Sequence, residues 1–168
     1  MSAASVQKLC ESTRDKLKSA IDVMEQFLNK NALPQLVTGQ DEEEVQYYQG
    51  FLTDLRHLLV FSEVSYEKLG VALRRAAFNE EFAEKALYNV YHHVVNSFFY
   101  PKNESYSEDG RYAYTGQDAI RFRRQPVQDA KQVILDITRN FEEIRDELSY
   151  YESDYLTQRR MQSQRNHA

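Results

Sequence analysis

The chain has 168 residues, a formal net charge of −5, 42% hydrophobic residues and 28% charged residues. This length fits one domain with a substantial core, and the negative charge argues against a dedicated nucleic-acid binder. Five glycines and three prolines are too few for an all-β fold with many tight turns. Charged and apolar residues alternate at the start, so no signal peptide is predicted, and the single cysteine, Cys10, fits a cytoplasmic protein.

Apolar residues recur at helical spacing in the first half of the chain. The first stripe predicts an amphipathic helix over residues 5–30. A second helix is predicted to begin at Asp41, which can form a capping box with Glu44, and to run to about Leu73. The run 58–61 is apolar all round, which predicts that other groups surround the middle of this helix.

A third helix is predicted from Asn79, a capping residue, to Tyr100. It ends there because Pro101 disfavours helical backbone in the residue before it. Its apolar residues form two rows in which every step is four residues. The rows are Phe82, Ala86, Val90, Val94 and Phe98, and Ala83, Leu87, Tyr91, Val95 and Phe99.

The last apolar stripe steps by three and four residues from Ala130 to Tyr155. It predicts one continuous helix from Val127 to about Arg160. A frayed tail is predicted over residues 163–168, as is common at chain ends.

Residues 101–126, between the third and fourth helices, break the helical pattern. The Asp109-Gly110 pair within them is typical of a tight hairpin turn. We therefore predict a single domain over residues 1–168 with an all-α fold. Its architecture would be an antiparallel four-helix bundle with a long non-helical insert, for which a β-hairpin is one interpretation.

Three stretches of the sequence carry a family resemblance. They are residues 58–63, the run from 83–88 through Tyr91-His92 and 98–102 to 108–116, and Glu147-Leu148 with residues 151–155. These stretches resemble the YpuI family, small Bacillus-type proteins of unknown function, and the resemblance covers most of the chain after about Tyr47. It implies a cytoplasmic bacterial protein. It implies no activity and transfers no catalytic residue.

The insert combines arginine with tyrosine, and it is the first candidate binding surface. The candidate residues are Arg111, Tyr112, Tyr114, Arg121, Arg123 and Arg124. Tyrosine and arginine are enriched at protein interfaces, so we predict binding of a protein partner through this patch. Self-association is a variant of this prediction, because the apolar segment of the second predicted helix and the long fourth helix could extend past one bundle. The same residues suit phosphate contact and base stacking, so RNA, single-stranded DNA or a nucleotide is the alternative ligand. A third interpretation is packing of the tyrosines on the bundle.

A second candidate is a polar line on the third helix, formed by Asn89, His93 and Asn96 at spacings of four and three. It predicts a polar pocket between helices, a layer that fixes helix register, or a solvated face. We expect His93 to flank the core and His92 to lie near the opposite side.

Sequence patterns for catalysis and metal binding are weak. No histidine follows a glutamate by three residues, so the di-iron bundle pattern is missing. A zinc site would require His57 to meet His92 or His93 across two helices. Cys10 lies on the apolar stripe and is predicted to be a core residue. We expect no metal, no cofactor, no membrane span and a non-catalytic role; an unrecognised hydrolase or nuclease is the remaining alternative.

Overall fold

The structure, a computed structural model, describes residues 1–99 and 126–167, and the regular secondary structure in these ranges is entirely helical. The elements are α1 (Ala3–Lys30), α2 (Leu33–Leu36), α3 (Glu42–Arg74), α4 (Glu80–Asn89), the π-helix η1 (Val90–Val95), α5 (Asn96–Phe99), α6 (Gln128–Glu147), the 3₁₀ turn η3 (Ser149–Tyr151) and α7 (Asp154–Asn166). The all-α prediction is confirmed for the described residues. The hairpin interpretation of the insert lies outside them.

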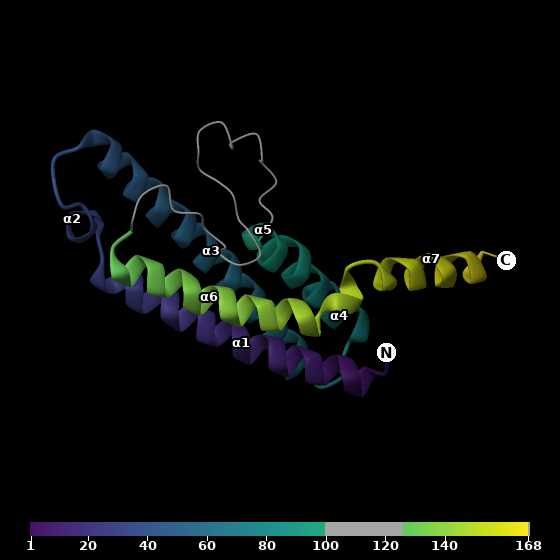
Figure 1. Cartoon of the computed structure of the whole chain (residues 1–168). Coiled ribbons are helices and arrows are strands. Elements are labelled where there is room, and N and C mark those ends of the chain that lie inside the picture. Colours follow the sequence, from purple (N-terminus) through teal and green to yellow (C-terminus); the bar gives the residue numbers. More distant parts are fainter. Residues whose placement is uncertain (100–125, 168) are drawn as a thin grey trace.

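Helix α1 is the central element of the core, because three other helices pack against it; in Figure 1 it runs alongside α6. It packs against α3, α4 and α6, and its apolar stripe is buried along its whole length. Successive long helices run in opposite directions, and α1 and α6 are antiparallel as well. At one end of that pair, Ser12 Oγ donates to Glu147 Oε2 at 2.8 Å, and Lys16 forms an ion pair with the same carboxylate. The start of α1 is thereby fixed to the end of α6.

Helix α3 begins as predicted, at Asp41, but without the capping box. The Asp41 carboxylate accepts a hydrogen bond from the Glu43 backbone N–H at 3.1 Å. The Glu44 carboxylate instead accepts from the backbone N–H and the hydroxyl of Thr38, because the preceding turn offers two donors there. The prediction for residues 58–61 is wrong on one side of the helix: Val60 is 54% exposed and Phe61 is 57% exposed.

The third predicted helix is a continuous helical segment whose middle, η1, has widened turns. The Asn96 N–H donates to the carbonyl of Tyr91, five residues back, which defines a π-helix. In an α-helix, a row with four-residue steps drifts by about 40° per step around the axis. The widened turns offset this drift, so both apolar rows remain buried as far as Phe98 and Phe99.

The predicted continuous fourth helix is interrupted. Helix α6 ends at Glu147, η3 makes a single 3₁₀ turn, and α7 restarts at Asp154. The apolar spacing continues across the break, because Tyr151 and Tyr155 are both buried. Where the sequence predicts a frayed tail over residues 163–168, α7 remains helical to Asn166. It projects away from the other helices, with Tyr155 as its buried residue (Figure 1).

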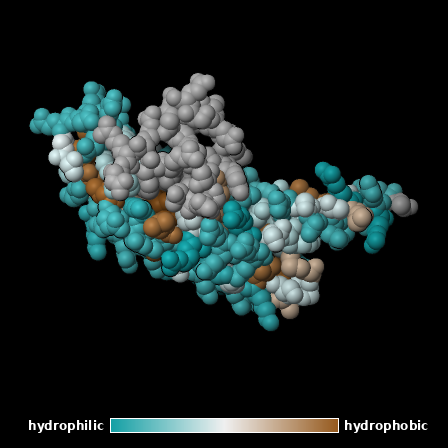
Figure 2. Space-filling model, in the orientation of Figure 1, coloured by the Kyte–Doolittle hydropathy of each residue, from teal (hydrophilic) through white to brown (hydrophobic). Residues whose placement is uncertain are grey.

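The surface of the molecule is mostly hydrophilic on the face that Figure 2 shows, with apolar side chains in a few places. Within the described ranges, no helix combines the length and the apolar character needed to cross a bilayer. The buried apolar residues form one cluster shared by the long helices. The stability of the domain therefore depends on this shared core.

The central position of α1 gives a testable prediction about stability. Leu17 is fully buried, whereas Leu135 on α6 is 37% exposed. We expect Leu17→Ala to lower the free energy of unfolding by about 2–5 kcal/mol, because it removes buried methyl groups and leaves a cavity. Leu135→Ala, the matched control, should cost less than about 1 kcal/mol. Urea unfolding followed by circular dichroism measures both, and equal losses would contradict the central role of α1.

Candidate functional site

Two parts of the chain that carry the family resemblance meet at one end of the molecule: residues 83–88 with Tyr91-His92, and Glu147-Leu148 with residues 151–155. The Tyr151 hydroxyl donates to Glu84 Oε1 at 3.3 Å, across 67 residues of sequence. The ring of Tyr155 lies 5.6 Å from that of Tyr88 and 5.2 Å from that of Tyr151. We call these three tyrosines, together with Tyr150, the tyrosine cluster.

His92, in the π-helix, contacts the tyrosine cluster through Tyr151 and Tyr88. Its Nε2 lies 2.7 Å from the backbone carbonyl oxygen of Tyr151. A carbonyl oxygen can only accept, so Nε2 carries the proton and, in the neutral ring, Nδ1 is the acceptor. The ring also stacks on Tyr88, with 4.2 Å between the centroids. His92 therefore positions the cluster, because it binds the backbone carbonyl of Tyr151 just beyond the end of α6.

Glu84 is a partly buried carboxylate in an unfavourable environment for charge. Burial raises its pKa, and the nearby charge of Glu80 raises it further. The hydrogen bond from Tyr151 and the positive charges of the N-terminal ammonium and of Arg159 act in the opposite direction without cancelling the shift. Burial, followed by the charge of Glu84, raises the pKa of Tyr151 as well, so its hydroxyl remains a donor. Two cations of the chain therefore act on Glu84 without fully compensating its burial.

The tyrosine cluster and Glu84 border a surface hollow, which we call the tyrosine-lined hollow. Its lining residues are Met1, Glu80, Glu84, Tyr150, Tyr155, Gln158, Arg159 and Gln162. Glu80 and Glu84 lie one helical turn apart on α4, so their carboxylates reach the same side of that helix. The hollow therefore combines two acidic groups and two aromatic rings with the guanidinium of Arg159 and with Met1.

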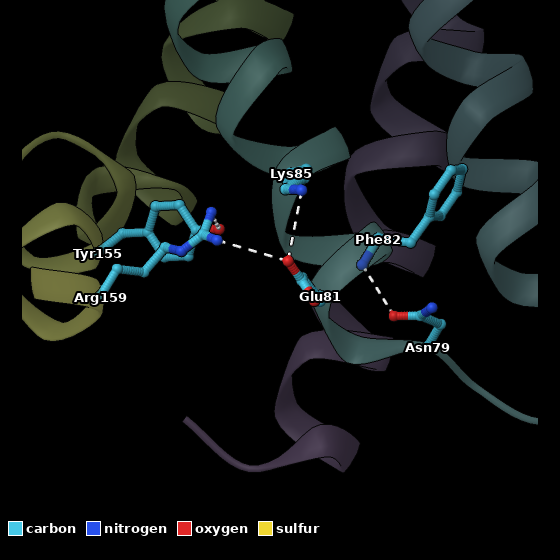
Figure 3. Close-up of polar contacts among 6 residues, drawn as sticks. All are labelled: Asn79, Glu81, Phe82, Lys85, Tyr155 and Arg159. Carbon is cyan, nitrogen blue, oxygen red and sulfur yellow. Dashed lines mark hydrogen bonds and ion pairs between the residues drawn. The ribbon is translucent and has the colours of Figure 1, made fainter. Parts of the chain in front are cut away.

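Arg159 is itself a lining residue of the hollow, and Figure 3 shows it beside Tyr155 and Glu81. Arg159 Nη2 donates to Glu81 Oε1 at 3.4 Å, and Lys85 pairs with the same oxygen at 3.3 Å. The guanidinium carbon lies 5.7 Å from the Tyr155 ring centroid, within the range of a cation–π contact. These contacts attach α7 to α4, and they show that a cation fits against this acidic and aromatic surface.

The candidate residues from the sequence are distributed differently. Arg111, Tyr112, Tyr114, Arg121, Arg123 and Arg124 lie outside the described residues. Asn89 and Asn96 are half-buried, and the Asn96 Oδ1 atom is buried without a hydrogen-bond partner among the described residues. His93 is exposed, so the expectation that it flanks the core is wrong. The π-helix shifts the register, and His92 takes the inner position instead.

The described residues offer little for catalysis or metal binding. His57 and His93 are exposed, and His92 is held by Tyr151. No group of three potential metal ligands occurs in residues 1–99 and 126–167. Cys10 is fully buried, and burial, with the charges of Glu11 and Glu84, raises its pKa to about 12. Its thiol is therefore a poor nucleophile at neutral pH.

The fold and the site together define a protein that is all-helical over residues 1–99 and 126–167 and that carries a tyrosine-lined hollow with two glutamates. The chain belongs to the family described as protein of unknown function DUF3907, whose family model matches residues 10–157. It is 32% identical over 148 residues to the uncharacterized protein YpuI of Bacillus subtilis (strain 168), which corresponds to 88% of this chain and 82% of that protein. The predicted family resemblance is thereby confirmed. No solved structure matches the chain.

Glu84 and the tyrosine cluster were not among the candidate residues predicted from the sequence. Part of the signal was present in the resemblance, since its stretches 83–88, Tyr91-His92 and 151–155 contain Glu84, Tyr88, His92, Tyr151 and Tyr155. The family model also spans Glu80, Glu84, Tyr150 and Tyr155. Arg159 lies beyond the matched range, so it is a feature of this chain outside the family match.

The buried thiol gives a prediction about reactivity. The pKa of Cys10 is about 12 instead of 9.0, so its thiolate fraction at pH 8 is lower by about a thousand-fold. We expect the native protein to react with a disulfide reagent such as DTNB at least about 100-fold more slowly than the urea-unfolded chain. Fast labelling of native protein at the free-cysteine rate would contradict the buried position of Cys10.

The raised pKa of Glu84 gives a prediction about pH. The folded state binds this proton more tightly than the unfolded state does, so the carboxylate destabilises the fold above its raised pKa. We expect Glu84→Gln to stabilise the protein at pH 7 by less than about 1 kcal/mol, because solvent screens the partly exposed group. The gain should disappear as the pH falls to the ordinary range of a glutamate. Thermal melts from pH 4 to 8 test this, and a gain that grows at low pH would contradict it.

Proposed function

We propose that this chain is a non-catalytic interaction module that binds a basic side chain of a protein partner in the tyrosine-lined hollow. The observation that carries the proposal is the lining of one hollow by the carboxylates of Glu80 and Glu84 and the rings of Tyr150 and Tyr155. Carboxylates form charge-assisted hydrogen bonds to ammonium and guanidinium groups. Tyrosine rings attract the same cations through their faces.

The carboxylates and aromatic rings of the hollow favour a cationic ligand. Glu80 and Glu84, one turn apart, attract a cation, and the Arg159 guanidinium and the N-terminal ammonium in the same lining offset part of that attraction. The raised pKa of Glu84 also indicates a carboxylate that a cationic ligand would stabilise in its charged form. The cation–π contact between Arg159 and Tyr155 of the same chain supports this preference.

The proposed scaffold is the four-helix bundle expected from the sequence, in which α1, α3, α6 and the segment α4–η1–α5 are the four members. In this arrangement the insert joins two members of the bundle. Its arginines and tyrosines supply a second proposed contact with the partner, on the grounds of composition alone. The hollow would take a basic side chain, whereas the insert would face acidic or aromatic groups.

The first experiment uses a blocked Gly-Arg-Gly peptide as the probe and follows the tyrosine ring resonances by NMR. We expect saturable shifts at Tyr150 and Tyr155 with a Kd of about 1 mM, because one cation makes few contacts. A Gly-Gln-Gly peptide should cause no saturable shift. The double variant Glu80→Gln/Glu84→Gln should weaken binding of the arginine peptide by at least about fivefold.

The matched control removes two charges elsewhere. Glu142→Gln/Glu143→Gln on α6 changes the net charge equally and should leave the affinity unchanged. Equal weakening by both double variants would show a general charge effect and would overturn the proposed site. Equal shifts with the glutamine peptide would overturn the preference for a cation.

A crosslinked capture from the native host tests the partner. The wild type would run beside Glu80→Gln/Glu84→Gln and beside Arg121→Ala/Arg123→Ala/Arg124→Ala, with bound proteins and bound nucleic acid both identified. Loss of one protein from the first variant supports the proposal. Recovery of nucleic acid that only the arginine variant loses would support the alternative ligand instead.

A further inference from the structure

We infer that two copies of this chain pair through the outer face of α3 as a short antiparallel coiled coil. The inference concerns a surface separate from the tyrosine-lined hollow, so either proposal can fail without the other. It depends on a row of side chains that the core does not use. We call this row the outer strip, and it consists of Thr53, His57, Val60, Val64, Glu67 and Val71.

The outer strip has the spacing of a coiled-coil seam. Its steps are four, three, four, three and four residues, and all six side chains are exposed. Val60 is 54% exposed, Val64 44% and Val71 40%, although all three are large apolar residues. The residues of α3 that face the core are a separate set, which includes Leu55, Ser62 and Leu69. Helix α3 therefore carries a second seam, with a period of 3.5 residues.

The outer strip is complementary to itself when the second copy is reversed. A two-fold axis between Val60 and Val64 places each of these valines opposite the other valine of the second copy. It also places His57 opposite Glu67 of the second copy, and Thr53 opposite Val71 of the second copy. The two apolar layers lie at the centre, and an attractive imidazole–carboxylate pair flanks them on each side.

The charges select the direction of pairing. In a parallel pair in register, each residue faces the same residue of the second copy, so Glu67 would face Glu67 and His57 would face His57. Two like pairs are less favourable than two unlike pairs, so the antiparallel arrangement is preferred. Phe61, which is 57% exposed, lies beside the central layers and can cover their edge. A second copy thus matches the strip in charge and in apolar character.

The size of the strip sets the expected strength. From residue 53 to residue 71 an α-helix rises about 27 Å, and only the central layers, Phe61 and Val71 are strongly apolar. Such an interface is small for a permanent dimer. We expect a reversible dimer with a dissociation constant of about 10–100 µM.

Sedimentation equilibrium of the full chain from about 1 to 500 µM tests the dimer. We expect Glu67→Lys to weaken dimerisation by at least tenfold, and His57→Glu/Glu67→Lys to restore it, because the exchanged charges again face each other. Glu143→Lys on α6 is the matched control and should leave dimerisation unchanged. A wild type that stays monomeric at 500 µM overturns the inference, as does a double variant that remains as weak as Glu67→Lys.

The direction of pairing has its own test by disulfide trapping. The single variants Val60→Cys and Val64→Cys are mixed under mild oxidation, and Cys10 does not compete because it is buried. Antiparallel pairing predicts that the mixed 60–64 disulfide forms faster than either symmetric one. Predominance of the symmetric disulfides would indicate a parallel pair and would overturn the proposed arrangement.

Discussion

The described site depends on the contacts of the buried residue Tyr151. Its hydroxyl donates to Glu84 of α4, and its backbone carbonyl accepts from His92 of the π-helix. The residue lies in the 3₁₀ turn between α6 and α7, so it joins the interruption of one helix to the middle of another. Tyr151 is fully buried and both hydrogen bonds are part-buried, so losing either bond leaves a buried polar group of Tyr151 without its partner, which is costly. From this point helix α7 projects away from the other helices.

The distribution of charge around Tyr151 follows from the helix ends that meet there. Helix α4 begins with two glutamates, Glu80 and Glu81, which suit the positive end of its dipole. The same acidic turn faces the basic side chain of Arg159 on α7. A feature that stabilises a helix terminus therefore also creates an acidic surface. Tyrosine rings beside this surface give it a preference for cations, which the helix dipole alone would not provide.

Helical periodicity predicted most of the scaffold, and its failures have identifiable causes. The break after Glu147 could not be predicted from the sequence, because Leu148, Tyr151 and Tyr155 keep the helical spacing across it. The π-helix left a trace, since apolar rows with uniform four-residue steps require widened turns to stay on one side. The exposed side of residues 58–61 could not be predicted, because an all-apolar run does not say whether its neighbours belong to the same chain.

The sequence by itself determined the helical class, the start of each long helix and the family, since these depend on local spacing, capping residues and recognisable stretches. Only the tertiary structure decided that Glu84, His92 and Tyr151 share one site. His92 and Glu84 precede Tyr151 by 59 and 67 positions, so the three meet only when α4, η1 and η3 pack together. It also decided which histidine faces inward, because one widened turn rotates every later side chain. Burial, and the pKa shifts that follow from it, are properties of that packing rather than of any local pattern.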